Sequence, residues 1–440
     1  MRRAEGADDA SEAAAGTVLR RAPFSDNPLV GVRGQRTQQR ILDSALRAFG
    51  DEGYHRCSID SITKLAGCSR VSFYQYFSSK EHVLRHLVAQ VTRQLDASTD
   101  LLDPVSAGEE GWAAVRAWVA RYAEIHERYQ PVFHAVPGEA DALQADGPPG
   151  TTGRYVVGIR SRLVQPALAG RTVDAIIELA RECLGRTLDD VSTLRSVAAD
   201  AFQLDDVLDA YTDVVHRTLF GLRPETNLHG RRGPRPPKLP FGPIMRALLD
   251  EDRGFGAAVR QGGPSLEALV GAARDVFVDR GFDGTRVDDI VEAAGVSHGA
   301  FYRYFKNKDE LAHLLAADAM RTISTTLVEI PDVAADGRGA RTALRRWLRA
   351  YNRAQAGETA MVRVWVDAAL HDDTLAADSA AVIDWGRRRM VRFLRPRGFG
   401  DVEVDALVMV ALVDAFGVRE RPARTVDAAV QIIERGFLGR

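Results

Sequence analysis

Two nine-residue segments share a pattern that begins with hydrogen-bonding side chains and ends with aromatic ones. They read SRVSFYQYF at 69–77 and SHGAFYRYF at 297–305. Serine, arginine and histidine at the start of a short helix can donate hydrogen bonds to base edges and phosphates. The aromatic half can seat such a helix on a protein core. The pattern therefore indicates nucleic-acid recognition, with any difference in specificity just after the serine.

These segments belong to a longer internal repeat. A shift of 228 residues aligns 41–87 with 269–315 without a gap. The other matching segments are AVRAWVARY with ALRRWLRAY (114–122 and 343–351) and VVHRTLFG with IIERGFLG (214–221 and 432–439). Self-similarity at such a spacing indicates repeated structural units. The chain is predicted to hold two related units in tandem.

Each repeat is predicted to be helical. A stripe of apolar residues forms a first helix, which ends at Gly53 in the first copy. In the second copy, Thr285 with Asp288 is predicted to cap a second helix. A turn at Gly67 or Gly295 then leads to the third helix, which the serine of the nine-residue segment caps. Helix, short glycine turn and helix make a helix-turn-helix arrangement.

Composition restricts the remaining function classes. The 440 residues carry a net charge of −2, with 45% hydrophobic and 27% charged residues, as in ordinary globular proteins. No signal peptide or membrane-spanning run is predicted, and three widely spaced cysteines fit a reduced, cytoplasmic protein. The sequence lacks a glycine-rich phosphate loop, metal-spaced His/Cys sets and a nucleophile motif. We therefore expect neither an enzyme nor a bound cofactor or metal.

The two motifs resemble the TetR family of bacterial transcriptional repressors. The chain reads GYHRCSIDSIT…AGCSRVSFYQYFSSK from Gly53 and GFDGTRVDDIV…AGVSHGAFYRYFKNK from Gly281. The resemblance implies an all-α fold of two units, each a three-helix DNA-binding domain followed by a helical ligand-binding and dimerisation domain. It also implies a transcriptional repressor that binds double-stranded DNA and is released from it by a small molecule. Members of the family normally have one such DNA-binding domain, here called a head, in each chain. The tandem arrangement departs from this architecture.

The resemblance also implies the residues that contact DNA. Base contacts are expected from Arg70, Val71 and Ser72 in the first copy, and from His298, Gly299 and Ala300 in the second. Phosphate contacts are expected from Ser58, Tyr74, Lys80, Arg286, Tyr302 and Lys308. The expected set also includes Ser69, Thr285 and Ser297. The family pattern is broken at Cys57 and at Arg286, where small hydroxyl residues are usual.

Six segments are predicted along the chain. They are a disordered tail (1–32), DNA-binding domain 1 (33–83), ligand-binding-like domain 1 (84–222), a basic Pro/Gly linker (223–243), DNA-binding domain 2 (244–310) and ligand-binding-like domain 2 (311–440). Arg33 and Arg36 would end the tail, as a minor-groove arm or merely as solubilising charges. A short helix is expected over 244–260.

The two heads differ in charge. Residues 33–80 contain eight basic and four acidic side chains, a net +4, whereas residues 261–308 contain six and seven, a net −1. Phosphate attraction drives sequence-independent DNA binding, so the first head is expected to be the stronger anchor. Together with the unlike base-reading residues, this predicts an asymmetric operator. The alternative is a regulator or scaffold in which only the first head binds DNA.

Aromatic residues at helical spacing could line an effector pocket, although such residues are more often core. The candidates are Trp118, Tyr122, Phe133, Trp347, Tyr351, Trp365 and Trp385. An apolar effector would suit them, and an acidic one would suit the basic segment WGRRRMVRF at 385–393. We expect a monomeric pseudo-dimer that satisfies its own dimer interface; a homodimer of tandem chains is the alternative.

Overall fold

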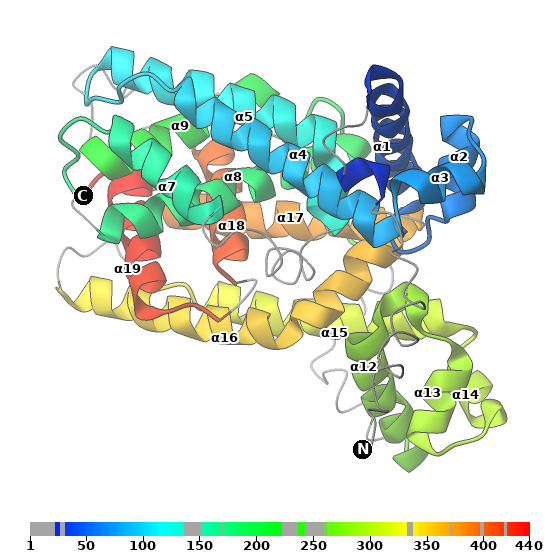
Figure 1. Cartoon of the computed structure of the whole chain (residues 1–440). Helices are drawn as coiled ribbons and strands as arrows, with labels where there is room; N and C mark the ends of the chain where they lie inside the picture. Colours follow the sequence, from blue (N-terminus) through cyan, green and yellow to red (C-terminus); the bar gives the residue numbers. More distant parts are fainter. Residues whose placement is uncertain are drawn as a thin grey trace, which may run out of the picture. The chain divides into compact units, whose positions relative to one another are not determined.

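The computed structural model describes most of the chain. The described residues are 23–26, 31–135, 151–168, 171–221, 236–242, 246, 259, 262–331, 338–369, 372–396, 400–417 and 420–440. They form helices and no strand, with one isolated parallel bridge between Val105 and Leu163. The predicted all-α fold is thus confirmed (Figure 1). None of the described helices is long and apolar enough to cross a membrane.

Residue contacts divide the chain into two compact units, residues 1–89 and 90–440. This division falls within helix α4 (Lys80–Asp100). The boundaries of the six predicted segments stay predictions. The short helix expected over 244–260 lies largely outside the described residues.

The first unit is a three-helix head with an additional N-terminal turn. Its elements are the 3-10 helix η1 (Phe24–Asp26), α1 (Val32–Glu52), α2 (Ile59–Ala66), α3 (Arg70–Tyr76) and the start of α4. Fully buried Ile41, Ile62, Phe73 and Phe77 hold the helices together. As predicted, Gly53 ends α1, with a φ of 77° that an L side chain rarely adopts.

The tail predicted over residues 1–32 contains an ordered turn near its C-terminal end. Residues Phe24–Asp26 form η1, which contacts both α1 and α3. The ring of Phe24 meets the ring of Tyr76 edge-on, with 5.5 Å between centroids. Arg33 and Arg36 are helical, because α1 already begins at Val32. The contacts of η1 join segments that are distant in the sequence, and helical periodicity does not indicate such contacts.

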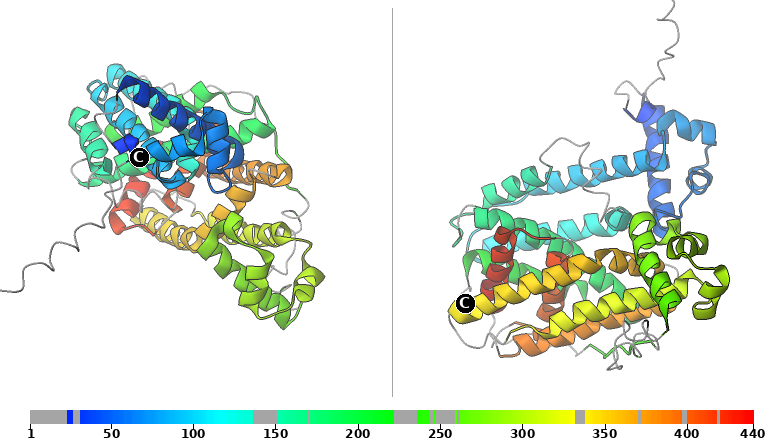
Figure 2. Two further views of the ribbon diagram at one scale, coloured as in Figure 1. Left: turned by 45° about the vertical axis from the view of Figure 1, so that its right-hand side comes forward. Right: turned by 90° about the horizontal axis from the view of Figure 1, so that it is seen from below.

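The second unit contains the second head and two sets of long helices (Figures 1 and 2). The head comprises α12 (Pro264–Gly284), α13 (Val287–Ala294) and α14 (His298–Tyr304), followed by α15 (Lys308–Val328). The helices of the first repeat are α5 (Glu109–Ala135), α7 (Thr151–Arg162), α8 (Arg171–Val197) and α9 (Leu204–Phe220). Those of the second repeat are α16 (Arg338–Ala369), α17 (Asp373–Leu394), α18 (Val402–Gly417), α19 (Ala423–Gln431) and the π-helix η2 (Ile432–Phe437).

The last helices of the two repeats pack against each other. Helix α8 contacts α18 and α19, and α9 contacts α18 and η2 (Figure 1). Arg217 Nε donates to the Gly436 carbonyl at 2.8 Å, and Arg435 Nε donates to the Thr218 carbonyl at 2.8 Å. In the repeat alignment Arg217 matches Arg435, and Thr218 matches Gly436. Such reciprocal contacts characterise a two-fold interface, which here lies within one chain.

Close approach at this interface requires a glycine. A Cβ atom built on Gly436 would lie 2.5 Å from Thr218 Oγ1 and 2.8 Å from the Val214 carbonyl oxygen. Real Cβ atoms are not found this close to backbone, so a larger residue would force α9 and η2 apart. Glycine therefore fixes the separation at which the two arginines reach their carbonyl acceptors.

Candidate nucleic-acid interface

Local sequence explains how each third helix is formed and oriented. Gly67 and Gly295 adopt left-handed conformations, with φ of 60° and 64°, and end α2 and α13. Ser69 Oγ then accepts a hydrogen bond from the Ser72 N–H at 3.1 Å. In the second head, Ser297 Oγ accepts one from the Ala300 N–H at 3.2 Å. The predicted turns and serine caps of α3 and α14 are confirmed.

Both third helices expose the residues expected to contact bases and bury the residues expected to pack against the core of the head. In α3, Val71 is 72% exposed, whereas Phe73 is fully buried. In α14, His298 and Gly299 are exposed, while Phe301 is fully buried. Arg70 is also exposed, and Ser72 and Ala300 are half-buried. The predicted base-contact residues therefore begin each helix and remain largely accessible to solvent.

Acidic residues of the preceding helices lie beside Arg70 and His298, two of the residues expected to contact bases. Arg70 Nη1 lies 3.4 Å from Asp60 Oδ2, and His298 Nε2 lies 2.6 Å from Asp288 Oδ1. A hydrogen bond with Tyr74 and the charge of Asp60 raise the pKa of the Arg70 guanidinium. All these side chains are exposed, so the pairs contribute little stability and can open when a stronger acceptor arrives.

The residues expected to contact phosphate fall into two groups. The N-caps Ser58 and Arg286 are exposed, as are Tyr74 (47%) and Tyr302 (58%). Lys80 and Lys308 instead point into their own heads, where they bind backbone carbonyls.

The ammonium group of Lys80 donates to the carbonyls of Tyr54, His55 and Cys57, at 2.6, 3.1 and 2.9 Å. It also lies 4.6 Å from the centre of the Tyr54 ring. Lys308 donates to the carbonyls of Phe282 and Thr285 at 2.6 and 2.9 Å. These contacts join the fourth helix to the end of the first helix or the residues that follow it in both heads. Their role in each head is therefore structural, and a phosphate contact stays a prediction.

The predicted cap at Thr285 and Asp288 is wrong. Helix α13 begins one residue later, with Arg286 as N-cap, and Asp289 Oδ2 accepts the Arg286 N–H at 2.8 Å. Thr285 is 2% exposed, and its hydroxyl donates to the Gly281 carbonyl at 2.7 Å. Thr285 fills the same buried position as Cys57 of the first head, which removes it from any surface that could meet DNA.

Burial also decides the chemistry of Cys57. The residue is 3% exposed, and this burial raises the pKa of its thiol to about 11. The thiolate that disulfide exchange requires is therefore scarce near neutral pH. Cys57 behaves as a small core residue.

The candidate pocket residues of the first repeat form an aromatic cluster. The Trp118 ring lies 5.7 Å from Tyr122 and 5.8 Å from Tyr155, and Tyr122 lies 6.4 Å from Phe133. Trp118 and Tyr155 are 9% and 4% exposed. In the part of the chain that the structure describes, the Trp118 indole N–H and the Tyr155 hydroxyl have no hydrogen-bond partner. Two buried donors without acceptors are costly, unless another molecule supplies the acceptors.

The candidate pocket residues Trp347, Tyr351 and Trp365 of the second repeat donate their hydrogen bonds to acceptors within the protein. Trp347 Nε1 donates to the Thr326 carbonyl at 2.8 Å, and the Tyr351 hydroxyl donates to Asp414 Oδ1 at 2.8 Å. Trp365 Nε1 donates to Ser379 Oγ. These three aromatic residues are therefore part of the core in the second repeat.

Trp385 lies at a different cavity. This cavity of about 530 Å³ is formed where the described end of the linker crosses α17. It is lined by Lys238, Leu239, Pro240, Phe241, Arg246, Trp385, Arg388 and Arg392. Four of these residues are cationic, so the site suits an anion with an apolar body. The sequence indicates a basic linker and a basic segment in α17, but not that the two lie opposite each other.

Comparison with known proteins assigns both heads to one class. The family described as "Bacterial regulatory proteins, tetR family" matches residues 41–87 and 269–315. These ranges contain the two helix-turn-helix arrangements described above. Both heads therefore match the same family segment, as their motifs predicted.

Several bacterial proteins are similar to parts of the chain. The HTH-type transcriptional repressor DhaR of Mycobacterium sp. (strain GP1) is 38% identical over 68 residues, 14% of this chain and 34% of the relative. The repressor NicS of Pseudomonas putida is 31% identical over 131 residues, 25% of this chain and 62% of the relative. The transposon Tn10 TetC protein of Escherichia coli is 39% identical over 69 residues, 14% and 35% respectively. The matches thus span about one third to three fifths of these relatives.

Proposed function

We propose that the chain is a cytoplasmic, DNA-binding transcriptional repressor whose two heads read an operator with two unlike half-sites. The observation that carries this proposal is the pair of exposed, differently built helix starts, RVS in α3 and HGA in α14. Arginine can bind guanine through two hydrogen bonds, and valine suits a thymine methyl group. Histidine makes one strong contact, and glycine makes none through a side chain.

Selection of bound duplexes from a random pool tests this proposal. The expected consensus joins two different half-sites about one helical turn, 34–36 Å, apart. Arg70→Ala is expected to relax sequence preference in one half-site and His298→Ala in the other. Gln75→Ala and Arg303→Ala, at exposed positions later in α3 and α14, serve as controls. A palindromic consensus, or relaxation at the same bases by both variants, would refute the asymmetric operator.

We propose further that one chain supplies both heads without a partner. The reciprocal bonds from Arg217 and Arg435 support this, because an interface closed within the chain leaves no reason for a second copy. Light scattering of the free and the DNA-bound protein is the test. A protein mass near 48.1 kDa is expected, whereas a mass near twice that value would support the homodimer alternative.

The effector site that the contacts favour is the aromatic cluster of the first repeat. An apolar molecule with hydrogen-bond acceptors would satisfy the donors of Trp118 and Tyr155 and stack on the surrounding rings. Native mass spectrometry of the purified chain can detect such a molecule. Trp118→Phe should weaken its binding, whereas Trp347→Phe, the matching substitution in the second repeat, should not.

An acidic effector at the cavity beside Trp385 is the second candidate, supported by its four cationic residues. Arg392→Gln should then weaken the binding of aromatic carboxylates and leave the Trp118 site unaffected. Equal effects of both variants on one ligand would contradict the assignment of two separate sites.

A regulator in which only the first head binds DNA remains the alternative function. Its support is the net charge of −1 over residues 261–308, against +4 over residues 33–80. If His298→Ala changes neither affinity nor sequence preference while Arg70→Ala changes both, this alternative replaces the two-headed reader.

A further inference from the structure

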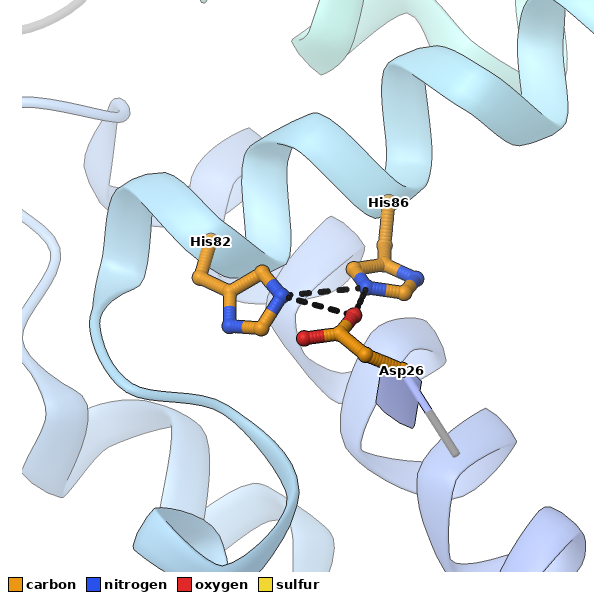
Figure 3. Close-up of side chains that lie close together, drawn as sticks. All are labelled: Asp26, His82 and His86. Atoms are coloured by element: carbon orange, nitrogen blue, oxygen red, sulfur yellow. Dashed lines mark hydrogen bonds and ion pairs between the residues drawn. The ribbon is translucent and has the colours of Figure 1, made fainter. Parts of the chain in front are cut away.

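Three metal-ligating side chains converge in the first unit, away from the surface expected to read bases. His82 and His86 lie one helical turn apart on α4, and Asp26 reaches them from η1 (Figure 3). Asp26 Oδ1 lies 3.2 Å from His82 Nε2 and 3.1 Å from His86 Nε2. The two Nε2 atoms are 3.2 Å apart. The three atoms therefore form a nearly equilateral triangle.

This triangle is awkward for hydrogen bonds and well shaped for a metal ion. If both imidazoles carried a hydrogen on Nε2, the two hydrogens would point at the same Asp26 oxygen and lie close together. If only one carried it, that single N–H could not point at both the Asp26 oxygen and the other Nε2. An ion about 2.1 Å from each atom would lie only about 1 Å above their plane. At that bond length tetrahedral ligands are about 3.4 Å apart, close to the observed separations.

We propose that Asp26, His82 and His86 form a site for a divalent transition-metal ion, with Zn²⁺ as the best-fitting candidate. Two imidazoles and one carboxylate are common zinc ligands, and three protein ligands leave a fourth position for water. The side chain of His82 is 8% exposed, His86 25% and Asp26 44%. The site is thus anchored on its buried side and accessible to an ion from the other.

The surroundings of His82 provide the support that such a ligand requires. Its Nδ1 lies 3.2 Å from Ser78 Oγ and 3.2 Å from the Ser78 N–H. Metal binding at Nε2 places the ring proton on Nδ1, which then donates to Ser78 Oγ instead of accepting from the amide. A hydrogen bond of this kind fixes the tautomer and orientation of a metal-bound imidazole. The Phe77 ring meets both imidazoles edge-on, with centroids 5.6 and 5.4 Å away.

The second head lacks this pair of histidines. In the alignment of the repeats, His82 corresponds to Glu310 and His86 to Leu314. The site is therefore specific to the first head. Leu314 occupies the position of His86 in the second head, so a leucine is compatible with this helix position.

The site would connect metal binding to the recognition helix, a consequence that rests on the proposed DNA-binding function. Asp26 belongs to η1, whose Phe24 contacts Tyr76 at the end of α3, and Phe77 follows directly. A bound ion would fix η1 to α4 across this end of α3. Metal is therefore expected to strengthen binding to the half-site that the first head reads.

Calorimetric titration of the full chain tests the site itself. Protein stripped with a chelator is titrated with Zn²⁺, in parallel with Asp26→Asn, His86→Leu and the control His55→Leu, an exposed histidine of the same unit. One tightly bound equivalent is expected for the wild type and the control, with binding more than about tenfold weaker in the other two. Circular dichroism verifies that the variants fold. Equal zinc binding by all four proteins, or none by the wild type, would overturn the site.

Co²⁺ provides a spectroscopic check, because its visible absorption reports the coordinating atoms. Bands that appear in the wild type and are absent from His86→Leu support the site, whereas identical spectra refute it. Gel shifts with and without Zn²⁺ then test regulation. Zinc-independent DNA affinity would refute the regulatory consequence, and failure to bind any DNA would refute the proposed function. The titration requires no DNA and decides the metal site in either case.

Discussion

Replacing Lys80 with methionine should destabilise the first head, independently of any contact between Lys80 and a phosphate. The ammonium group donates to three backbone carbonyls in the loop after α1. A hydrogen bond from a charged donor contributes about 1.5–3 kcal/mol, and the contributions of neighbouring bonds do not add fully. The exposed carbonyl of His55 can turn to water, so we expect a total loss of about 2–4 kcal/mol. Lys308→Met should destabilise the second head in the same way, because its ammonium group donates to the carbonyls of Phe282 and Thr285.

Hydrogen exchange of the full chain is the appropriate assay, because it resolves the stability of each head separately. Amides of α2 and α3 should exchange faster in Lys80→Met, with those of α13 and α14 unchanged; Lys308→Met should do the reverse. Lys64→Met and Lys306→Met remove exposed lysines from the two heads and serve as controls. If Lys80→Met keeps wild-type protection yet loses DNA affinity, the lysine acts on phosphate and the structural role is refuted.

Three further outcomes follow from particular contacts. Gly436→Val should destabilise the second unit by about 1–3 kcal/mol in urea unfolding, because its side chain would overlap α9; Gly357→Ala, which meets open space, should be neutral or stabilising. Arg70→Ala should reduce discrimination at its guanine by roughly 5- to 150-fold in competition gel shifts, and an unchanged preference would exclude a base contact. Trp118→Phe should cost less stability than Trp347→Phe, because the Trp347 indole donates to the Thr326 carbonyl while the Trp118 indole has no partner in the described part of the chain; the reverse order would contradict this difference.

Much of each head could be predicted because it depends on local chemistry. Gly67 must occupy a left-handed turn, Ser69 must cap the helix that follows, and Phe73 must pack inward. Each requirement involves residues within a few positions of one another, and all three were visible in the repeat. Periodicity and capping signals are reliable over such distances.

The failures concern contacts between segments far apart in the chain. Nothing in the residues around Asp26 shows that they meet α4, although HVLRH at 82–86 places two histidines on one helix face. The residue type of Thr285 predicts a helix cap, whereas the burial of that position moves the start of α13 to the next residue. The roles of Lys80 and Lys308 were also hidden, because their acceptors are backbone carbonyls more than twenty residues away.

Because the two repeats lie in one chain, residues on the two sides of this interface can be substituted independently, which is impossible in a homodimer. In a homodimer every substitution at a two-fold interface appears twice, so a favourable contact on one side is tied to its copy on the other. Here Arg217 and Arg435 keep the reciprocal bonds that hold the halves together. Away from this centre the copies have diverged, since the Trp347 indole donates a hydrogen bond to the protein whereas the Trp118 indole has no partner among the described residues. If the proposed effector binds beside Trp118, one repeat holds the ligand while the other serves as a rigid support, and the two heads can diverge in the same way without loss of the interface.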